Sequence, residues 1–501
     1  MQQLLFHNFS GRNLPDYRHH EFDSMLVSNG MVIKTGFQLS AQHDMITVDL
    51  KGKTVLAAFA DAHVHMTQTG IALSGVELEA ATSIDSVLQL LAKESGNSEY
   101  VLAWGLQETR LKERRLPTTA ELDHACPGNF VWVARQDLHS AVLNSTALKW
   151  AKAINPDLCE NSGLISGNDY NQLCYNLIDK LPAAFKQNGF KLVQEQCFKQ
   201  GVASIHALEG SRESTADTIA AASFINNSAL HAVFYHQSAD STLAVQHGWK
   251  GMGGCLLVDG SLGTRTASLH SPYTDAPECS GNLYLKADDI EGLLATARKN
   301  QLHLALHAIG DRAIDLVTTS YAWATQKWGR PAIADRIEHF IMPSDKAIRL
   351  AREHALNICV QPAFDRYWGG TDGLYAQRLG CERASRLNPF KTMLDLGIQL
   401  AAGSDSPVTP INPLAGIFAF VHHSNPEERL SLNSALSLFI CDPHKLSGES
   451  LIRGQLKTGY HADFICLNND PFKLAPAHLG KLRVEQLFIG GRNLYTKPDN
   501  Q

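Results

Sequence analysis

The chain has 501 residues, more than a typical single domain, which predicts either two domains or one large barrel with additions. Hydrophobic residues make up 44% and charged residues 19% of it, a composition typical of a globular protein and not of a disordered or fibrous one. The 44 Lys and Arg against 50 Asp and Glu leave a formal net charge of −6, so no basic excess indicates a nucleic-acid partner.

Membrane and secretion signals are not found in the sequence. It has no apolar run long enough to span a bilayer, so no membrane partner is predicted. The N-terminus lacks a positive cluster followed by an apolar core, so no secretion signal is predicted. The 10 cysteines form no C-x-x-C pair, which argues against a zinc finger or a disulfide scaffold. These features favour reduced thiols and a cytoplasmic location.

Both ends of the chain have the short, alternating apolar pattern of β-hairpins, with Gly and Asn turns between the strands. The segments concerned are 24–30, 31–36 and 45–50 near the N-terminus, and 462–467 and 484–491 near the C-terminus. A small β-sandwich-like module formed by residues 1–54 and 445–501 is therefore predicted to flank a central α/β domain.

The central part, residues 55–444, alternates short apolar segments with helical patterns, which predicts a (β/α)8 TIM-type barrel. The candidate strands are 55–60, 100–105, 130–135, 201–206, 231–236, 255–259, 303–307, 336–339, 357–361 and 399–405. These are ten, whereas a barrel of this type needs eight. If 399–405 is the eighth strand, then 201–206 is the second, and the segments at 100–105 and 130–135 belong to an insertion at about 67–200, after barrel strand 1.

The first barrel strand ends in two histidines one residue apart, His63 and His65. Alternate side chains of an extended strand point the same way, so these two imidazoles converge. Two neutral imidazoles at the end of a buried strand can hold a divalent metal. By themselves they could equally be two hydrogen-bonded polar residues of a loop.

Further metal-binding residue types follow later strands. His307 and His339 each end a predicted strand, and Asp405 ends the segment Leu400-Ala-Ala-Gly-Ser-Asp. A single histidine or a Gly-Ser-Asp turn is common in loops. Because barrel enzymes place their sites at the C-terminal ends of the strands, the four histidines and Asp405 together predict one metal site.

These motifs resemble the amidohydrolase superfamily, and more closely its amidohydrolase-3 branch, which contains N-substituted formamide deformylase-like proteins. The resemblance begins with Phe59-x-Asp-x-His-x-His65, His307, His339 and Gly403-Ser-Asp405. Supporting motifs run over almost the whole chain: Arg135-x-Asp-x-His139, Asn144-Ser-x-Ala-Leu148, Asp259-Gly-Ser-Leu-Gly-Thr-Arg-Thr-Ala267, Leu306-His-Ala-Ile-Gly-Asp311, Arg336-Ile-Glu-His339, Asn412-Pro-Leu414 and Gly459-Tyr-His-Ala-Asp463.

The chain departs from the family pattern at three positions. The Pro-Gly that usually precedes the Phe of the first strand is Ala57-Ala58 here. The glutamate that relatives often show after Gly-x-Leu-x is missing, since Gly163-Leu-Ile-Ser is followed by Gly167. Cys255 occupies the position where many relatives have a metal-bridging lysine. A thiolate can also bind zinc, so Cys255 is a candidate ligand, and the alternative is an inert buried thiol of a core strand.

The resemblance implies a metal-dependent hydrolase that cleaves a carbon–nitrogen, non-peptide bond in an amide, N-acyl or N-formyl small molecule. The expected cofactor is a divalent metal, zinc first, as one or two ions held by His63, His65, Cys255, His307, His339 and Asp405. Asp405 is the expected catalytic residue, taking a proton from the attacking water. The candidate substrate-binding residues are Arg135, His139, Arg265 and Asp311, although both arginines could instead form ion pairs.

Two other classes of function stay open. One is deaminase, isomerase or lactonase chemistry on the same fold, and the other is a non-catalytic barrel that binds a small molecule. The expected partner is a small-molecule substrate, with a homodimer as the expected assembly if the chain is oligomeric.

Overall fold

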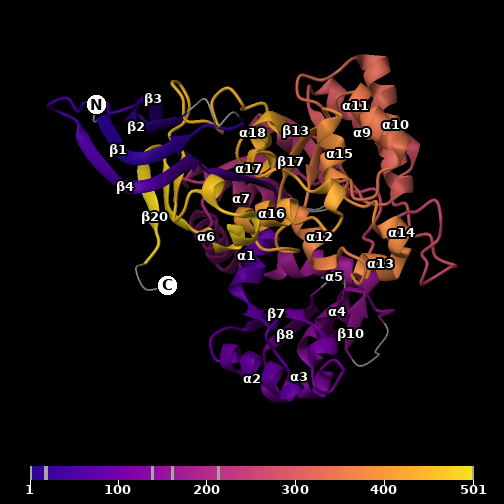
Figure 1. Cartoon of the computed structure of the whole chain (residues 1–501). Coiled ribbons are helices and arrows are strands. Elements are labelled where there is room, and N and C mark those ends of the chain that lie inside the picture. The colour runs from indigo at the N-terminus through magenta and orange to yellow at the C-terminus, as the bar shows by residue number, and fades with distance from the viewer. Residues whose placement is uncertain (1–2, 16–20, 137–139, 159–162, 211–214, 499–501) are drawn as a thin grey trace.

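The computed structural model describes residues 3–15, 21–136, 140–158, 163–210 and 215–498. Figure 1 shows three parts: a sheet that contains both chain ends, a central α/β body, and a lobe formed by residues of the first third of the chain. No helix in the described ranges is both long and apolar enough to cross a membrane. The nine cysteines in these ranges are free thiols.

The central body contains eight strands, which form two parallel sheets in the orders β12-β11-β5 and β13-β14-β15-β16-β17. They are β5 (Phe59–Val64), β11 (Val202–Glu209), β12 (His231–His236), β13 (Gly251–Leu257), β14 (His303–Ala308), β15 (Arg336–His339), β16 (Asn357–Val360) and β17 (Gln399–Ala402). One isolated bridge, between Val64 and Ser406, connects β5 to the segment after β17. Among the described residues no ladder joins β12 to β13, so the strands are not hydrogen-bonded into a closed barrel.

Helices follow most of these strands, as expected for parallel strands that need crossover connections. They are α1 (Met66–Ser74), α6 (Ala183–Lys199), α7 (Ala216–Asn226), α8 (Thr242–His247), α9 (Ala287–Lys299), α10 (Asp311–Trp328), α11 (Asp345–Glu353), α12 (Pro362–Trp368), α13 (Leu374–Leu379), α14 (Cys381–Ala384), α15 (Phe390–Asp395), α16 (Pro413–Val421), α17 (Leu432–Ile440) and α18 (Asp442–Leu446). Most strand residues are buried, because both faces of a parallel sheet are covered.

The two chain ends pair in one seven-stranded sheet, as the sequence predicts, with the order β20-β19-β18-β4-β1-β2-β3. Its strands are β1 (Gln3–Arg12), β2 (Glu21–Ser28), β3 (Met31–Gly36), β4 (Ile46–Ala57), β18 (Phe464–Leu467), β19 (Val484–Ile489) and β20 (Arg492–Thr496). The rings of Phe6, Phe464 and Phe488 meet at centroid distances of 4.5–5.4 Å and join the two ends. The module is one sheet, so the sandwich-like arrangement is not confirmed, and its boundaries at 54 and 445 stay predictions.

Two strand predictions need correction. The apolar run from Val55 to Ala60 was expected to be one strand, but β4 ends at Ala57 and β5 begins at Phe59. The chain changes sheets at Ala58, whose N–H donates to Asp463 O at 2.9 Å. The strand expected from Cys255 begins at Gly251, because this glycine-rich stretch forms an irregular pairing with β14 that sequence patterns do not detect.

The insertion forms a separate five-stranded sheet, with the order β10-β9-β8-β7-β6, and appears as the lower lobe in Figure 1. Its elements are β6 (Val76–Glu77), α2 (Ile84–Ser95), β7 (Tyr100–Leu106), α3 (Thr119–Ala125), β8 (Phe130–Arg135), β9 (Ser140–Leu143), α4 (Ser145–Ile154), β10 (Leu164–Ser166) and α5 (Gly167–Lys180). Alternate residues of β8 fall into different apolar clusters: Val131 belongs to one with α2 and α3, and Trp132 to one with α4 and α5. The lobe is therefore a sheet between two helical layers.

Candidate metal centre

The end of β5 and the segment after β17 are joined by backbone hydrogen bonds, and this junction brings His63 next to Asp405. Asp405 N donates to His63 O at 2.8 Å, and His65 N donates to Ser406 O at 3.0 Å. A side chain at Gly403 would place its Cβ 2.5 Å from His63 N, so only glycine permits this approach. The first and last strands of the central body therefore meet at the centre of the site.

The first group of donor atoms consists of His63, His65 and Asp405. Asp405 Oδ1 lies 3.1 Å from the Nε2 atoms of both histidines, and those two nitrogens are 3.3 Å apart. His63 is fully buried and Asp405 is 6% exposed, so water does not screen the charges.

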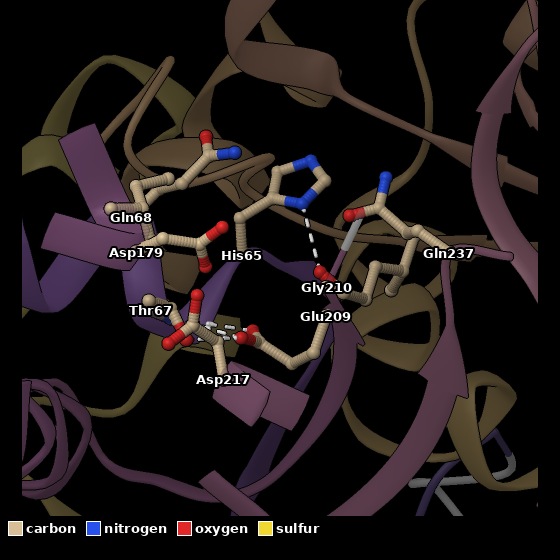
Figure 2. A pocket seen from close by; sticks show the side chains of 10 residues that line it. His65, Thr67, Gln68, Asp179, Glu209, Gly210, Asp217 and Gln237 are labelled. Atoms are coloured by element: carbon tan, nitrogen blue, oxygen red, sulfur yellow. Dashed lines mark hydrogen bonds between the residues drawn. The ribbon is translucent and has the colours of Figure 1, made fainter. Parts of the chain in front are cut away.

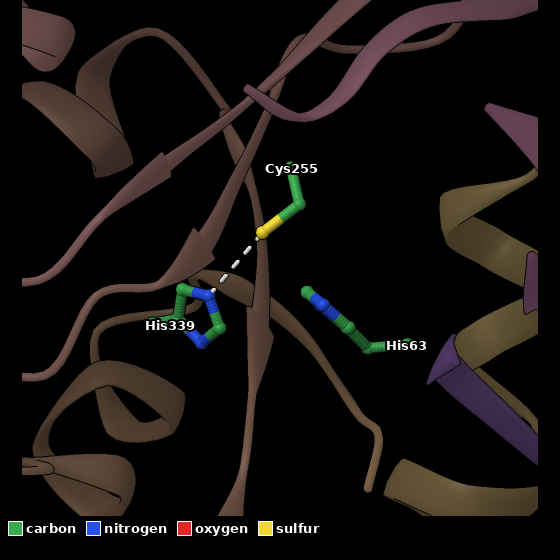
Figure 3. Close-up of side chains that lie close together, drawn as sticks. All are labelled: His63, Cys255 and His339. Carbon is green, nitrogen blue, oxygen red and sulfur yellow. Dashed lines mark hydrogen bonds between the residues drawn. The ribbon is translucent and has the colours of Figure 1, made fainter. Parts of the chain in front are cut away.

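The second group surrounds Cys255, which Figure 3 shows between His63 and His339. Cys255 Sγ lies 3.6 Å from His307 Nδ1 and 3.6 Å from His339 Nε2. Donor atoms of His63, Cys255 and His339 all lie within 4.8 Å of one another. His63 therefore belongs to both groups.

Each of the four histidines directs one ring nitrogen toward these groups and has the other nitrogen beside a fixed oxygen acceptor. Such an arrangement sets the tautomer and the ring orientation, as outer-shell partners do in metal sites. The pairs are His63 Nδ1 with Glu338 Oε2 (2.7 Å), His65 Nδ1 with Leu208 O (2.9 Å), His339 Nδ1 with Gln361 Oε1 (2.8 Å) and His307 Nε2 with Gly260 O (3.2 Å).

Acidic groups and histidines lie side by side in the buried site. Burial raises the pKa of Asp405, but the neighbouring His63 and His65 outweigh it and hold that pKa well below its usual value. Burial also raises the pKa of Cys255, yet hydrogen bonds from His307 and His339 lower it well below that of an ordinary thiol. Both groups therefore lose their proton more readily than an ordinary carboxyl or thiol, which suits them to hold a cation.

The donor set fits a divalent metal of the zinc type. Imidazole nitrogens, a thiolate and a carboxylate are the ligands that zinc prefers. Ligand bonds of about 2.0–2.3 Å in a tetrahedron place neighbouring donor atoms roughly 3–4 Å apart. The donor separations of 3.1–3.6 Å fall in this range.

Two of these residues have left-handed backbone conformations, which are uncommon outside glycine. The φ angle of His339 is 73° and that of Asp405 is 57°. Each such residue costs about 1–3 kcal/mol and persists where surrounding structure requires it, often at functional sites. The unfavourable backbone therefore adds to the case that these two side chains are placed for function.

Three of the four predicted substrate-binding residues lie in the described ranges, and each of them contacts another protein group. Arg135 pairs with Glu108 in the insertion, Nη2 to Oε1 at 2.6 Å. Arg265 pairs with Asp275 through two hydrogen bonds of 2.9 and 2.7 Å. Asp311 accepts from the backbone N–H of His270 at 2.9 Å, and His139 lies outside the described residues. Their contact with a substrate stays a prediction.

Several residues around the site were not assigned a role from sequence. Glu338 and Arg336 lie in the quoted Arg-Ile-Glu-His motif, and their spacing of two on a strand places both on one face, which is the signal that could have identified them. Gln361 carries no such signal.

A small cavity of about 20 Å³ lies beside His65, and Figure 2 shows its lining. The walls include Asp179 from α5, Asp217 from α7 and Gln237, which follows β12. Glu209 also lines the cavity, and its carboxylate accepts hydrogen bonds from Thr67 N at 3.1 Å and Thr67 Oγ1 at 2.6 Å. Burial raises the pKa of Glu209 to about 7.

Eight parallel strands with clustered metal-donor side chains at their C-terminal ends define a barrel-type metal-dependent enzyme. The amidohydrolase family model matches residues 47–495. The chain therefore belongs to the amidohydrolase family and is a metal-dependent hydrolase that acts on C–N bonds.

Individual relatives agree with this assignment. The chain is 27% identical to YtcJ of Bacillus subtilis (strain 168), which is named as an amidohydrolase, over 90% of each chain. It is 23% identical to the N-substituted formamide deformylase of Arthrobacter pascens over 98% of each chain. A solved structure of an uncharacterized metal-dependent hydrolase from Pyrococcus furiosus is 26% identical, with a TM-score of 0.80, over 94% of this chain and 100% of that one. Such neighbours imply a TIM-barrel-type fold.

Proposed function

We propose that this protein hydrolyses the C–N bond of an amide, N-acyl or N-formyl small molecule with a zinc-activated water. The observation that carries the proposal is the convergence of His63 and His65 on one oxygen of Asp405, 3.1 Å from each. A carboxylate in that position can bind a cation and accept a proton.

Two groups of residues would hold the metal. His63, His65 and Asp405 form one group, and Cys255, His307, His339 and the shared His63 form the other, so one or two ions can be accommodated. A divalent ion bound there supplies Lewis acidity, which polarises a substrate carbonyl and makes water easier to deprotonate.

Asp405 would perform the proton transfers. A carboxylate in this position is ionised at neutral pH and can accept a proton from the attacking water. It would then give this proton to the leaving nitrogen, whose protonation allows the C–N bond to break. The backbone bond from Asp405 N to His63 O keeps the carboxylate in position for both steps.

The relatives support a small-molecule substrate of the amide type. The Arthrobacter pascens relative is named a deformylase, which supports the N-formyl class for this chain.

The test combines metal analysis with a substrate panel. Purified protein should contain about one or two zinc ions per chain. A panel of N-formyl and N-acyl amines, assayed for released amine, should include a substrate whose hydrolysis stops on chelation and returns with Zn²⁺. Release of ammonia only, or of a hydroxy acid only, would favour deaminase or lactonase chemistry. A protein that binds no divalent metal would contradict the proposal.

A further inference from the structure

A buried ion pair lies directly behind the ligand candidate His63. Arg336 and Glu338, both on β15, are completely buried. Arg336 Nη2 donates to Glu338 Oε2 at 2.8 Å, and the same oxygen lies 2.7 Å from His63 Nδ1. One carboxylate oxygen therefore connects the guanidinium to the imidazole.

Arg336 is itself held by groups from the three strands of the other parallel sheet. Its Nη2 donates to Ala62 O of β5 at 2.5 Å, and its Nη1 lies 2.7 Å from His206 Nδ1 of β11. The guanidinium also lies over the ring of Tyr235 of β12, 5.0 Å from its centroid. Such a planar, multiply bonded cation has one orientation, which a lysine ammonium cannot reproduce.

We propose that Arg336 is a positioning residue for the metal centre: it holds the Glu338 carboxylate against His63 Nδ1, so that His63 Nε2 faces Asp405 and Cys255. The inference rests on the proposed metal site. A glutamate that had only to balance a buried arginine would not need to share an oxygen with a ligand ring. Because His63 belongs to both donor groups, an error in its ring orientation disturbs the whole centre.

The test is the zinc affinity of Arg336→Lys, measured by competition with a chromophoric chelator. Lysine keeps the charge but loses the fork that orients Glu338, so the affinity should fall about 10- to 100-fold, as on loss of an outer-shell partner. Tyr321→Phe is the matched control. It removes buried hydroxyl contacts to the main-chain oxygens of Leu304 (3.2 Å) and Arg336 (3.2 Å) but leaves the Arg336 side chain and the oxygen that it shares with His63 intact. Its zinc affinity should stay within about twofold of wild type, even if its stability falls.

A second variant covers the case in which Arg336→Lys does not fold. The double variant Arg336→Gln/Glu338→Gln removes both buried charges together, which is much less harmful than leaving one unpaired. It should fold and show the same loss of zinc affinity. Wild-type zinc affinity in either folded variant, or loss of folding in both, would show that Arg336 contributes to the stability of the fold and does not position the metal ligands. Absence of zinc binding by the wild-type protein would instead refute the metal site itself.

Discussion

Asp405 is the proposed ligand and the proposed proton carrier, and its left-handed backbone conformation is uncommon outside glycine. Asn keeps its shape and one oxygen donor but cannot accept the proton. We expect Asp405→Asn to retain bound zinc in part while kcat falls by about two to four orders of magnitude. The measurement is kcat together with metal content on folded protein, once a substrate is identified.

The control for this variant is Asp345→Asn, at an exposed position in the first turn of α11. It should leave kcat unchanged. If Asp405 only stabilised the turn after β17, Asp405→Asn would lower stability and leave turnover per folded molecule near wild type, which would refute the mechanism.

Cys255 decides whether the site has a thiolate ligand in the place of the family lysine. Its sulfur lies 3.6 Å from nitrogens of His307 and His339, and its pKa is lowered, so we expect it to bind the metal. A hydroxyl is a much poorer zinc ligand than a thiolate. Cys255→Ser should therefore reduce zinc affinity by at least about 10-fold. Loss of a residue that only orients a ligand already has an effect of this size.

A second buried cysteine provides the comparison for Cys255. Cys197 lies in α6, and burial raises its pKa well above that of an ordinary thiol. Cys197→Ser should keep zinc affinity although its buried hydroxyl reduces stability. Equal zinc affinity in the two variants would mean that Cys255 is an inert core thiol.

At the scale of elements, α1 carries the chain away from His65 and packs closely against α6. Their contact is between Gly70 and Gly189: a Cβ at Gly70 would lie 2.7 Å from the backbone of Gly189. The helices can approach this closely only without side chains at the contact. We expect Gly70→Ala to lower the free energy of unfolding by about 1–3 kcal/mol, measured by denaturant unfolding.

Gly292 is the matched control for Gly70. It lies in α9, and a Cβ there would meet no atom within 4 Å. Because alanine favours helix more than glycine does, Gly292→Ala should be neutral or stabilising by up to about 1 kcal/mol. A Gly70→Ala protein as stable as Gly292→Ala would show that the two helices can separate at no cost.

At the scale of the whole molecule, the proposed ligands come from β5, β13, β14, β15 and the segment after β17, so one centre would connect strands of both parallel sheets. An ion bound only by the folded state stabilises it by about 2.7 kcal/mol at a concentration 100 times its dissociation constant. Removal of the metal by chelation and dialysis should therefore lower the unfolding temperature, and Zn²⁺ should restore it. The measurement is scanning calorimetry of the loaded, depleted and reloaded protein. An unfolding temperature that does not change on depletion would contradict a centre that connects these strands.

Local patterns in the sequence determined much of this architecture. Alternation along an extended strand is a property of a few consecutive residues, so the convergence of His63 and His65 could be predicted without the fold. The alternation of apolar strands with helical segments likewise predicted eight central strands, and the β-rich texture of both ends predicted their shared sheet. His307, His339 and Asp405 each end a predicted strand, and this position indicated that they lie near His63 and His65.

Only the tertiary structure decided which distant groups meet. The change of sheet at Ala58 depends on a hydrogen bond to Asp463, more than 400 residues away in the sequence. The residues on both sides of Ala58 are equally apolar, so the sequence pattern does not reveal this change. The oxygens beside His65 and His339 come from Leu208 and Gln361, whose identity in the sequence carries no sign of this role. Pairing between distant segments depends on the packing of the whole chain, whereas periodicity in the sequence reports only on residues that are close along the chain. The oxygens that orient the histidine rings could therefore be identified only in the folded molecule.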